Sequence, residues 1–420
     1  MIKNGVCLVT SGHVASNPRL IKEANALAEA GYRVHVVSVS YQSATQRFDE
    51  TVYVSAPWNY TIIKLRFYQR IFGAVMQRVC RRLIGLPELL PIVVCSHSSV
   101  TAALKRVISG RPADLYVAHN LAALPAAAAA SKKYRAKLGF DAEDFHTGEL
   151  EATKGNRAEL KCRKYIEQRY FPVCSYLTSS SPSIAEEYKK EYGARMTPIL
   201  NVFPITDANS HAESTCKYIE RKREKSIYWF SQTISKDRGL DIAIRALTVM
   251  KVKAVLNIRG TPSPDFEAYL WPLTQELGIT DRVKILDPKP PGDMVRLAAE
   301  HDIGLSLENC QPRNRDICLT NKIFTYLLAG IPQIMTRTAA QAELAPTLGD
   351  AAILVDSGDA QQCANALDVM LSDEAKLERA KSAAYRLARD RFNWDLEKNK
   401  FLRIIENALS NDTENKLLVN

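Results

Sequence analysis

The sequence predicts an α/β protein built from two doubly wound domains, and three observations support this fold class. The chain has 420 residues, more than one hydrophobic core usually serves. Short apolar runs alternate with amphipathic helical stretches in both halves, which is typical of parallel sheets covered by helices on both faces. Residues 206–225 are polar and highly charged, which indicates a linker between a first domain, 1–205, and a second, 226–393.

The first half opens with a strand, a helix and a second strand. We expect strands at Val6–Thr10 and Arg33–Val39. The helix between them begins at Asn17, which supplies a capping side chain, and at Pro18, whose ring is preset for the first helical position. Gly31 ends it. Further strand–helix units are expected at 114–120, 136–144 and 175–193.

The same alternation restarts in the second half. A helix is expected from Leu240, and the tail from Glu374 to Ser410 has a helical pattern. Its last part, about 394–420, is amphipathic enough to pack back on the first domain. The expected strands lie at 226–231, 254–260, 282–288, 303–308, 332–336 and 351–357. Because open α/β sheets bind ligands at the carboxyl ends of their strands, we expect the chemistry in a cleft between the two domains.

Composition and charge narrow the classes of partner. The formal net charge of +10 favours polyanions, namely nucleotides, an anionic membrane surface or nucleic acid. The nine cysteines show no C-x-x-C pair and no zinc spacing, so we expect mostly reduced thiols in a cytoplasmic protein. No apolar run approaches the ~18 residues of a membrane span, and the chain opens on a strand without a long apolar signal region. We therefore expect a soluble protein or one that is peripheral at the inner face of a membrane.

Several well-known site motifs do not occur. No G-x-G-x-x-G follows the first strand, and the chain has no G-x-x-x-x-G-K-[ST] and no G-x-S-x-G. These absences weaken the case for NAD enzymes and P-loop NTPases. The segment DAEDFH, 141–146, comes nearest to a metal-binding cluster, but we interpret it as an acidic loop and predict no metal ion.

Candidate site residues are those charged, polar or glycine residues that follow a predicted strand. Such residues collect at the ligand-binding edge of a parallel sheet. In the first half they are His13, Ser16, Arg19, His119, Asp141, Glu143, Asp144 and His146. In the second half they are Gln232, Lys236, Arg238, Gly260, Glu308, Asn321 and Lys322.

Arg238 and Lys322 are the most informative of these candidates. Both lie where a helix of the second half begins, and the partial positive charge of a helix N-terminus disfavours a cation there. A diphosphate bound to both cations and to the helix ends would remove the conflict. The alternative for either residue alone is a solvated surface side chain.

Three segments together resemble a known family. They are SNPRLIKEANALAEAGYRVHVVS (16–38), FSQTISKDRGLDIAIRAL (230–247) and IGLSLENCQPRNRDICLTNKIFTYLLAGIP (303–332). They look like the retaining GT-B glycosyltransferases of the GT4 class, and the likeness covers nearly the whole chain. The resemblance implies two Rossmann-like domains, with a nucleotide-sugar on the second and an acceptor on the first. It also implies that cations hold the diphosphate without a required metal ion or other cofactor.

The resemblance assigns roles to individual positions. Arg238 lies where the family has a lysine before glycine, and Lys322 lies in the family's Asn-Lys-x-Phe helix start. Glu308 matches the first glutamate of the Glu-x7-Glu motif, which touches the donor sugar. His119 resembles a histidine near the transferred sugar, and Asn201 matches the asparagine of a "PNG" turn.

Two positions depart from the family pattern. Thr233 replaces the usual phosphate-binding arginine, and Thr325 replaces the second glutamate, which normally holds the ribose hydroxyls. The clamp on the diphosphate must therefore be Arg238 with Lys322. The full assignment is as follows: catalytic, His119, Arg238, Lys322 and Glu308; donor-binding, Gly12, Gln232, Gly260, Asn321 and Thr325; acceptor side, His13, Arg19 and His146.

A basic stretch suggests where the acceptor is found. Between Thr51 and Pro87 there are basic residues and no acidic ones, interleaved with apolar residues. This pattern suits an anionic membrane surface. It also suits nucleic acid, or a solvated helix with a core-facing stripe. The basic residues are Lys64, Arg66, Arg70, Arg78, Arg81 and Arg82.

The sequence thus predicts a metal-independent glycosyltransferase of retaining, hexosyl or N-acetylhexosaminyl type that takes part in polysaccharide or glycolipid assembly. Its expected partners are a UDP- or GDP-sugar and a lipid-linked or saccharide acceptor, and no nucleic acid is expected. The departures at Thr233 and Thr325 motivate an alternative, an inactive GT-B-like binding or scaffold subunit. A nucleic-acid-binding α/β protein is a third interpretation, motivated by charge alone.

Overall fold

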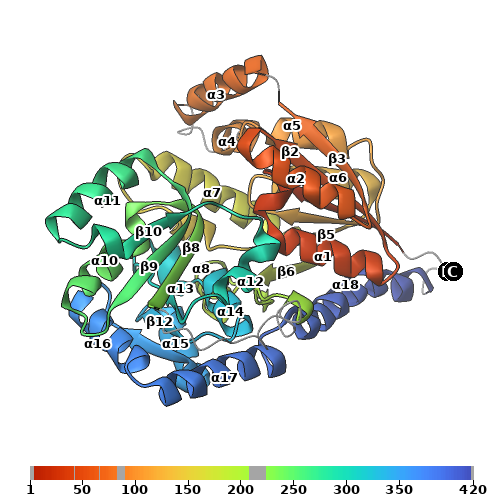
Figure 1. The fold of residues 1–420 in the computed structure, drawn as a ribbon. Helices are drawn as coiled ribbons and strands as arrows, with labels where there is room; N and C mark the ends of the chain where they lie inside the picture. The colour runs from red at the N-terminus through yellow and green to blue at the C-terminus, as the bar shows by residue number, and fades with distance from the viewer. Residues whose placement is uncertain (1–3, 42, 66, 83–89, 208–223, 418–420) are drawn as a thin grey trace. The chain divides into compact units, whose positions relative to one another are not determined.

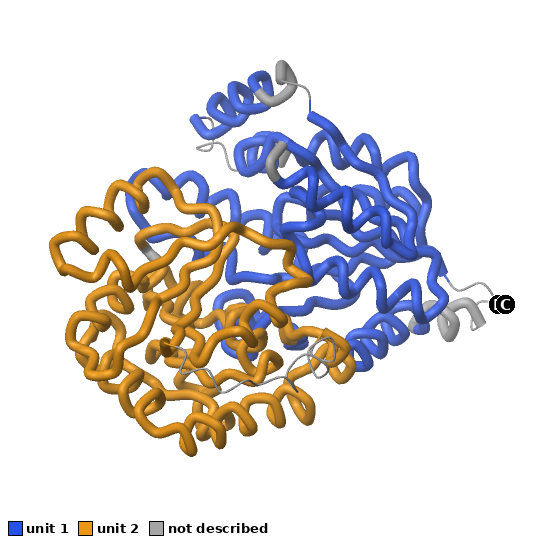
Figure 2. Tube along the Cα trace, viewed as in Figure 1, with its two compact units in different colours: residues 1–199, 398–420 blue, residues 200–397 orange. Residues whose placement is uncertain are grey.

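A computed structural model describes the chain except for residues 1–3, 42, 66, 83–89, 208–223 and 418–420. The chain forms two compact units: unit 1 contains residues 1–199 and 398–420, and unit 2 contains residues 200–397 (Figure 2). Each unit has its own parallel sheet, so the predicted two-sheet α/β class is confirmed. Most of the predicted linker, 206–225, lies outside the described residues.

The sheet of unit 1 has seven parallel strands in the order β3-β2-β1-β4-β5-β6-β7. Figure 1 labels β2, β3, β5 and β6 of this sheet. The order changes direction between β1 and β4, and in doubly wound sheets this is the point beside which ligands bind. The strands are β1 (Gly5–Thr10), β2 (Arg33–Ser40), β3 (Asn59–Lys64), β4 (Leu115–His119), β5 (Lys137–Ala142), β6 (Tyr176–Ser179) and β7 (Thr197–Pro198).

Helices connect these strands, and the first begins as predicted. The Oδ1 atom of Asn17 accepts a hydrogen bond from Leu20 N (2.9 Å), and Pro18 occupies the first helical position. The helices of unit 1 are α1 (Pro18–Glu29), α2 (Ser43–Ser55), α3 (Phe67–Arg82), α4 (Leu90–His97), α5 (Thr101–Ile108), α6 (Leu124–Tyr134), α7 (Arg157–Tyr170) and α8 (Pro182–Tyr192), with short 3-10 turns η1 (Val14–Ser16), η2 (His146–Gly148) and η3 (Phe171–Val173).

The basic stretch does not form one continuous segment. Its residues up to Ser55 belong to α2, strand β3 ends at Lys64, and α3 begins only at Phe67. The β-branched residues Thr61, Ile62 and Ile63 explain the strand, because they fit a pleated, half-buried edge better than a helix. The prediction of one basic amphipathic segment across Lys64–Arg82 is therefore wrong for its beginning.

The sheet of unit 2 has six parallel strands in the order β10-β9-β8-β11-β12-β13. They are β8 (Lys225–Ile234), β9 (Ala254–Pro262), β10 (Val283–Leu286), β11 (Ile303–Ser306), β12 (Gln333–Thr336) and β13 (Ala352–Val355). The helices are α10 (Leu240–Val249), α11 (Pro264–Glu276), α12 (Met294–Ala298), α13 (Arg313–Ile317), α14 (Asn321–Leu328), α15 (Ala339–Leu348), α16 (Ala360–Leu371), α17 (Glu374–Asp390) and the start of α18 (Trp394–Leu417). Four 3-10 turns are η5 (Lys236–Arg238), η6 (Thr280–Arg282), η7 (Pro291–Asp293) and η8 (Gly349–Ala351).

The C-terminal tail is two helices and not one. Asn393 separates them, because its Nδ2 atom donates to the carbonyls of Ala388 (3.0 Å) and Arg389 (2.8 Å) at the end of α17. Its Oδ1 atom accepts from Leu396 N (3.1 Å) at the start of α18. The eight cysteines in the described part of the chain are free thiols. Among the described helices none is long and apolar enough to cross a membrane.

Candidate functional site

A buried carboxylate organises the carboxyl-end loops of the unit 2 sheet. Glu308 follows β11 and is 1% exposed. Its main chain is fixed by Thr336, whose hydroxyl accepts from Glu308 N (2.8 Å) and donates to Glu308 O (2.6 Å). Its Oε1 atom lies 2.7 Å from Nζ of Lys322, and its Oε2 atom lies 3.1 Å from Nη1 of Arg315. Each carboxylate oxygen therefore has one cationic partner.

The electrostatic balance keeps Glu308 ionised. Burial alone would raise its pKa, but Lys322, Arg315 and Arg238 together lower the pKa below the ordinary value. Lys322 lies in the first turn of α14, where the helix dipole disfavours a cation, and Glu308 supplies a compensating anion. The Lys322 Nζ atom also lies 5.4 Å from the ring centroid of Trp229 on β8.

Arg238 reaches this cluster because of the glycine that follows it. Gly239 has φ +70°, and a Cβ atom there would lie 2.8 Å from the carbonyl oxygen of Leu307 on the loop after β11. This close approach brings η5, which ends in Arg238, near Glu308. No acceptor in the described part of the chain lies within hydrogen-bond reach of the buried Nε atom of Arg238. The predicted pair Arg238 and Lys322 thus comes together around one carboxylate.

The predicted donor-binding residues of unit 2 have different surroundings. Thr325 is fully buried on α14, and its Oγ1 atom has no hydrogen-bond partner among the described residues. Asn321 accepts a hydrogen bond from Nδ2 of Asn201 (2.6 Å). Gln232 is exposed on β8. Gly260 has φ +147°, and a Cβ atom there would meet Ser231 O at 2.1 Å, so this position requires glycine for strand packing.

Arg315 is the residue that sequence reasoning missed. It lies on α13, a short helix in the long loop between β11 and α14. Two neighbours anchor the helix, because Ile317 is 1% exposed and Asp316 Oδ1 accepts from Ala339 N (2.7 Å). The sequence shows only an arginine in a loop after a strand. The structure adds that this loop forms α13, which directs the Arg315 side chain back toward Glu308.

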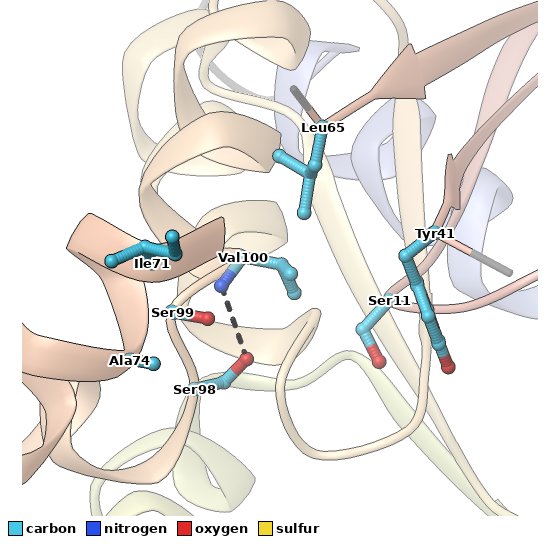
Figure 3. Close-up of a pocket in the computed structure, with 8 residues that line it drawn as sticks. All are labelled: Ser11, Tyr41, Leu65, Ile71, Ala74, Ser98, Ser99 and Val100. Atoms are coloured by element: carbon cyan, nitrogen blue, oxygen red, sulfur yellow. Dashed lines mark hydrogen bonds between the residues drawn. The ribbon is translucent and has the colours of Figure 1, made fainter. Parts of the chain in front are cut away.

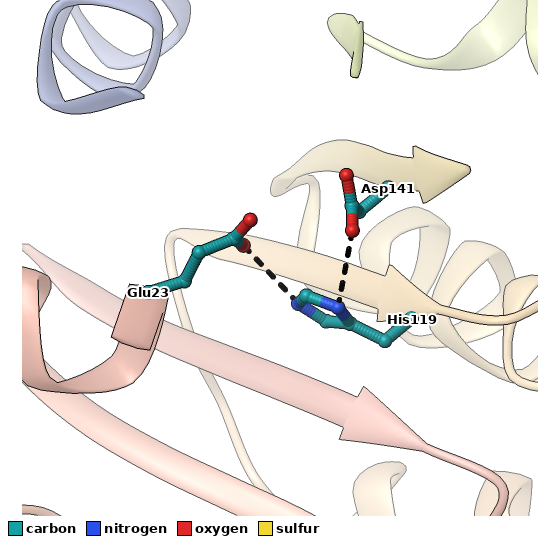
Figure 4. Close-up of side chains that lie close together, drawn as sticks. All are labelled: Glu23, His119 and Asp141. Carbon is teal, nitrogen blue, oxygen red and sulfur yellow. Dashed lines mark ion pairs between the residues drawn. The ribbon is translucent and has the colours of Figure 1, made fainter. Parts of the chain in front are cut away.

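A second buried charge cluster lies in unit 1 (Figure 4). His119, at the end of β4, is 0% exposed, and its Nε2 atom lies 3.2 Å from Oε2 of Glu23. Its Nδ1 atom lies 3.5 Å from Oδ2 of Asp141. Arg19 binds the same Asp141 through Nε (2.5 Å) and Nη2 (2.7 Å). Thr178 also donates to Asp141 (2.6 Å).

This cluster is held together by paired charges. Burial would lower the pKa of His119, but Glu23 and Asp141 outweigh it and raise the pKa to about 10, so the ring is an imidazolium ion. Glu23, His119 and Asp141 bring ligand atoms within 4.8 Å of one another. However, the two ring nitrogens face different carboxylates, and Arg19 already binds Asp141, so the group does not fit a metal ion. These contacts favour a structural role, and the catalytic role of His119 stays a prediction.

The other first-half candidates lie in the loops after β1 and β5. Nδ1 of His13 lies 2.6 Å from Oδ2 of Asp49, and its Nε2 accepts from Tyr41 N (3.1 Å), which places the ring proton on Nδ1. Gly12 O accepts from Val39 N (3.1 Å). His146 is 6% exposed, and its backbone N–H donates to the hydroxyl of Tyr188 (3.0 Å).

A pocket of about 600 Å³ opens near the carboxyl end of β1 (Figure 3). One part of its lining is hydroxyl-bearing and the other part is apolar. Such a lining suits a ligand that combines hydroxyl groups with an apolar portion. The lining residues are Ser11, Tyr41, Leu65, Ile71, Ala74, Ser98, Ser99 and Val100. Of the predicted acceptor-side residues His13, Arg19 and His146, none is in this lining.

Comparison with known proteins finds a family that part of this chain resembles. Residues 243–402 match the model of the family described as glycosyl transferase-like. Two curated D-inositol 3-phosphate glycosyltransferases, from Corynebacterium aurimucosum and Corynebacterium diphtheriae, are each 22% identical, over 61% and 57% of this chain. The chain is thus similar to the group 1 glycosyltransferases. This chain spans 63% and 58% of the length of those two relatives.

Solved structures support the predicted GT-B fold. Anabaena HepE, crystallised in complex with UDP-glucose, superposes with a TM-score of 0.69 at 16% identity, over 96% of this chain and 100% of that one. WaaG, a glycosyltransferase involved in lipopolysaccharide biosynthesis, superposes with a TM-score of 0.64 at 13% identity, over 95% and 99%. At these identities the likeness concerns the fold. The predicted resemblance to group 1 glycosyltransferases is confirmed.

Proposed function

We propose that this protein transfers a sugar from a nucleoside-diphosphate sugar to an acceptor hydroxyl, with retention at the anomeric carbon and without a metal ion. The observation that carries the proposal is the convergence of three cations, Arg238, Arg315 and Lys322, on one buried carboxylate in unit 2. The match to the glycosyl transferase-like family covers residues 243–402, which include most of unit 2 and the beginning of α18.

The chemistry follows from this charge distribution. Departure of a nucleoside diphosphate develops negative charge on its phosphate oxygens, and fixed cations stabilise that charge without having to reorganise. The N-terminus of α14, which carries Lys322, adds a partial positive charge. With these groups in place the leaving group needs no metal ion. The bond between the anomeric carbon and the diphosphate oxygen breaks, and the sugar becomes oxocarbenium-like. The acceptor oxygen then bonds to the anomeric carbon from the face that the diphosphate leaves, and the hydroxyl proton passes to an oxygen of the departing diphosphate.

In the proposed donor, the nucleotide is UDP or GDP and the sugar is a hexose or an N-acetylhexosamine. Support for a uridine nucleotide comes from HepE, which was crystallised with UDP-glucose and has the same fold. Support for a hydroxyl acceptor with an apolar portion comes from the unit 1 pocket, which is lined by three serines, one tyrosine and four aliphatic residues. A lipid-linked or saccharide acceptor of polysaccharide or glycolipid assembly combines these properties.

Helix α3 carries a surface suited to binding an anionic membrane. We propose that the enzyme is located at the inner face of that membrane. Its exposed apolar side chains include Phe72, which is 67% exposed, and Val75, which is 49% exposed. Arg78 and Arg82 lie on the same helix. Each cation near an anionic leaflet contributes about 1 kcal/mol, and the apolar residues add burial. Arg81 on the same helix is 44% exposed and pairs with Glu159 at 3.0 Å.

Vesicle co-sedimentation tests this surface. The protein should sediment with vesicles that contain anionic lipid and be released as the salt concentration rises. The double variant Arg78→Glu with Arg82→Glu should bind far less, with donor binding unchanged. Arg81 is kept, since its contact with Glu159 helps to hold α3. Equal binding to neutral and anionic vesicles would refute the membrane proposal.

The function itself is tested with donors first, because these need no identified acceptor. Purified protein is mixed with UDP-glucose, UDP-N-acetylglucosamine or GDP-mannose, and the melting temperature and the release of nucleoside diphosphate are measured. A true donor raises the melting temperature, because it binds only the folded state, and is hydrolysed slowly. Stoichiometric binding without any turnover, with water or with added saccharide acceptors, would favour the inactive scaffold. Strong salt-dependent binding to DNA or RNA would favour the third interpretation.

A further inference from the structure

We infer that a second, smaller pocket of unit 1 holds one sugar unit of a saccharide acceptor. The pocket has a volume of about 220 Å³ and is lined by residues of α2, β2 and β3. The inference rests on the proposed function, since it names the acceptor as a saccharide of at least two units. The lining residues are Ser40, Gln46, Asp49, Glu50, Tyr53, Val54, Tyr60, Ile62 and Lys64.

The small pocket is formed by one face of a helix and one face of a strand. Its residues on α2 recur at positions 46, 49, 50, 53 and 54, which is the spacing of neighbours on one helix face. Its residues on β3, Tyr60, Ile62 and Lys64, alternate along the chain, so they share one face of that strand. A volume below the roughly 300 Å³ at which pockets for drug-sized ligands begin suits a single ring-sized unit.

Aromatic rings form one wall of the small pocket. The rings of Tyr53 and Tyr60 are stacked, with centroids 4.2 Å apart and an interplanar angle of 25°. The Tyr53 hydroxyl lies 2.6 Å from Ser38 Oγ, and Trp58 packs edge-on against both tyrosines. Tyr53 and Trp58 are buried, whereas Tyr60 is 45% exposed. A ring that is held by its neighbours and open to solvent offers an apolar surface on which the C–H face of a pyranose can pack.

Polar groups beside these rings offer both donors and acceptors. Glu50 and Gln46 lie one helical turn apart, and Gln46 Nε2 donates to Glu50 Oε1 (3.3 Å). A carboxylate has about four acceptor sites and an ammonium group has three donors, so Glu50 and Lys64 can each bind a ligand hydroxyl. Because groups of both signs line the pocket, a neutral ligand rich in hydroxyls fits it better than a charged one. A sugar unit has these properties.

The small pocket adjoins the larger pocket of unit 1. Ser40 lines the small pocket and the next residue, Tyr41, lines the larger one (Figure 3). Lys64 and Leu65 are divided between the two pockets in the same way. Ser40 and Lys64 are partners in the register of β2 with β3, so both pockets meet at the ends of the same two strands. In this arrangement a saccharide whose acceptor unit occupies the larger pocket has its next unit on Tyr60.

The test is binding to a printed array of oligosaccharides, followed by titration of one that binds. Tyr60→Ala should weaken its binding roughly 3- to 10-fold, because the ring is lost, and Tyr60→Phe should bind as the native protein does. Glu50→Gln, which keeps the shape of the side chain, should weaken binding roughly threefold. Two matched controls should bind as the native protein does. They are Tyr385→Ala, since Tyr385 is 37% exposed in unit 2, and Glu186→Gln on the surface of unit 1.

Transfer then assigns the bound saccharide to the acceptor. With a donor that the native protein hydrolyses, Tyr60→Ala should raise the KM for the saccharide by the same factor and leave kcat and donor binding unchanged. Three results would overturn the inference: binding of no saccharide on the array, equal binding by Tyr60→Ala and native protein, or a bound saccharide that receives no sugar from such a donor. Native protein that binds none of the nucleotide-sugars, yet binds saccharides through Tyr60, would overturn the proposed function and leave the saccharide site.

Discussion

The two buried charge clusters differ in their balance of charge. Around Glu308 in unit 2, three cations act on one carboxylate. Around His119 in unit 1, the two cations His119 and Arg19 contact the two carboxylates Glu23 and Asp141, and both also interact with the carboxyl of Glu143. Carboxyl groups that match the cations in number compensate them and stabilise the fold, whereas several cations gathered around one carboxylate are suited to an anionic ligand. Both clusters are buried and contain basic and acidic residues. The ratio of cations to carboxyl groups is therefore what distinguishes a cluster with a structural role from one suited to binding a ligand.

The largest expected effect is on stability in unit 1. Asp141→Asn removes the carboxylate shared by the buried cations Arg19 and His119, so the free energy of unfolding should fall by about 3–5 kcal/mol. Urea titration at pH 7 measures it. The control is Glu186→Gln, whose partner Lys189 is exposed, and a surface pair contributes about 1 kcal/mol or less. A loss as small as that of the control would show that this cluster is not a structural one.

The next effect is on turnover in unit 2. Lys322→Ala and Arg238→Ala should each lower the rate of sugar transfer or donor hydrolysis by about 10²–10³-fold, because each removes charge stabilisation that grows as the diphosphate departs. Arg245→Ala, on the exposed side of α10, serves as the control. Circular dichroism should show an intact fold in all three. Rates near that of the native protein would contradict the clamp.

The pH dependence of stability tests the unit 1 cluster further. The pKa of His119 is raised from 6.5 to about 10 by Glu23 and Asp141, against the effect of burial. Its contribution is fully present below about pH 6.5, the pKa in the unfolded chain, and is lost as the pH rises toward 10. The difference in unfolding free energy between native protein and His119→Gln should therefore shrink between pH 6.5 and 10. A difference that stays constant over this range would show that His119 is not charged in the folded state.

The smallest effect is expected from chelation. EDTA should leave activity largely unchanged, because the cations around Glu308 take the place of a metal ion in the proposed mechanism. Activity is measured after dialysis against EDTA, with and without added Mg²⁺ or Mn²⁺. Complete loss that either ion restores would contradict the metal-independent proposal.

The buried strands could be predicted from the sequence because they lie in the interior of the sheets. Interior parallel strands such as β1 and β11 are apolar on both faces and give a continuous hydrophobic run. The edge strand β3 is exposed or half-buried along its length and gives no such run, so it was missed. The break between α17 and α18 was missed because a single side chain, that of Asn393, makes it.

The candidate sites could be predicted only in part. Arg238, Glu308 and Lys322 follow strands, so position alone selected them, and the structure brings them together. The partners of His119 could not be identified in this way, because Glu23 and Asp141 lie far from it in the sequence and only the sheet order makes them neighbours. Arg315 was missed for a similar reason, since its direction depends on the turn of α13.

Gly239 has a consequence for which substitutions this protein tolerates. Gly239 has a φ of +70°, and a Cβ atom there would lie only 2.8 Å from Leu307 O. The backbone conformation at Gly239, and not a side-chain contact, therefore sets the location of Arg238. In a library of variants selected for sugar transfer, Lys at position 238 should therefore survive more often than any residue other than glycine at position 239. Selection would then be stricter at Gly239, which has no side chain, than at Arg238, whose side chain acts in the proposed reaction.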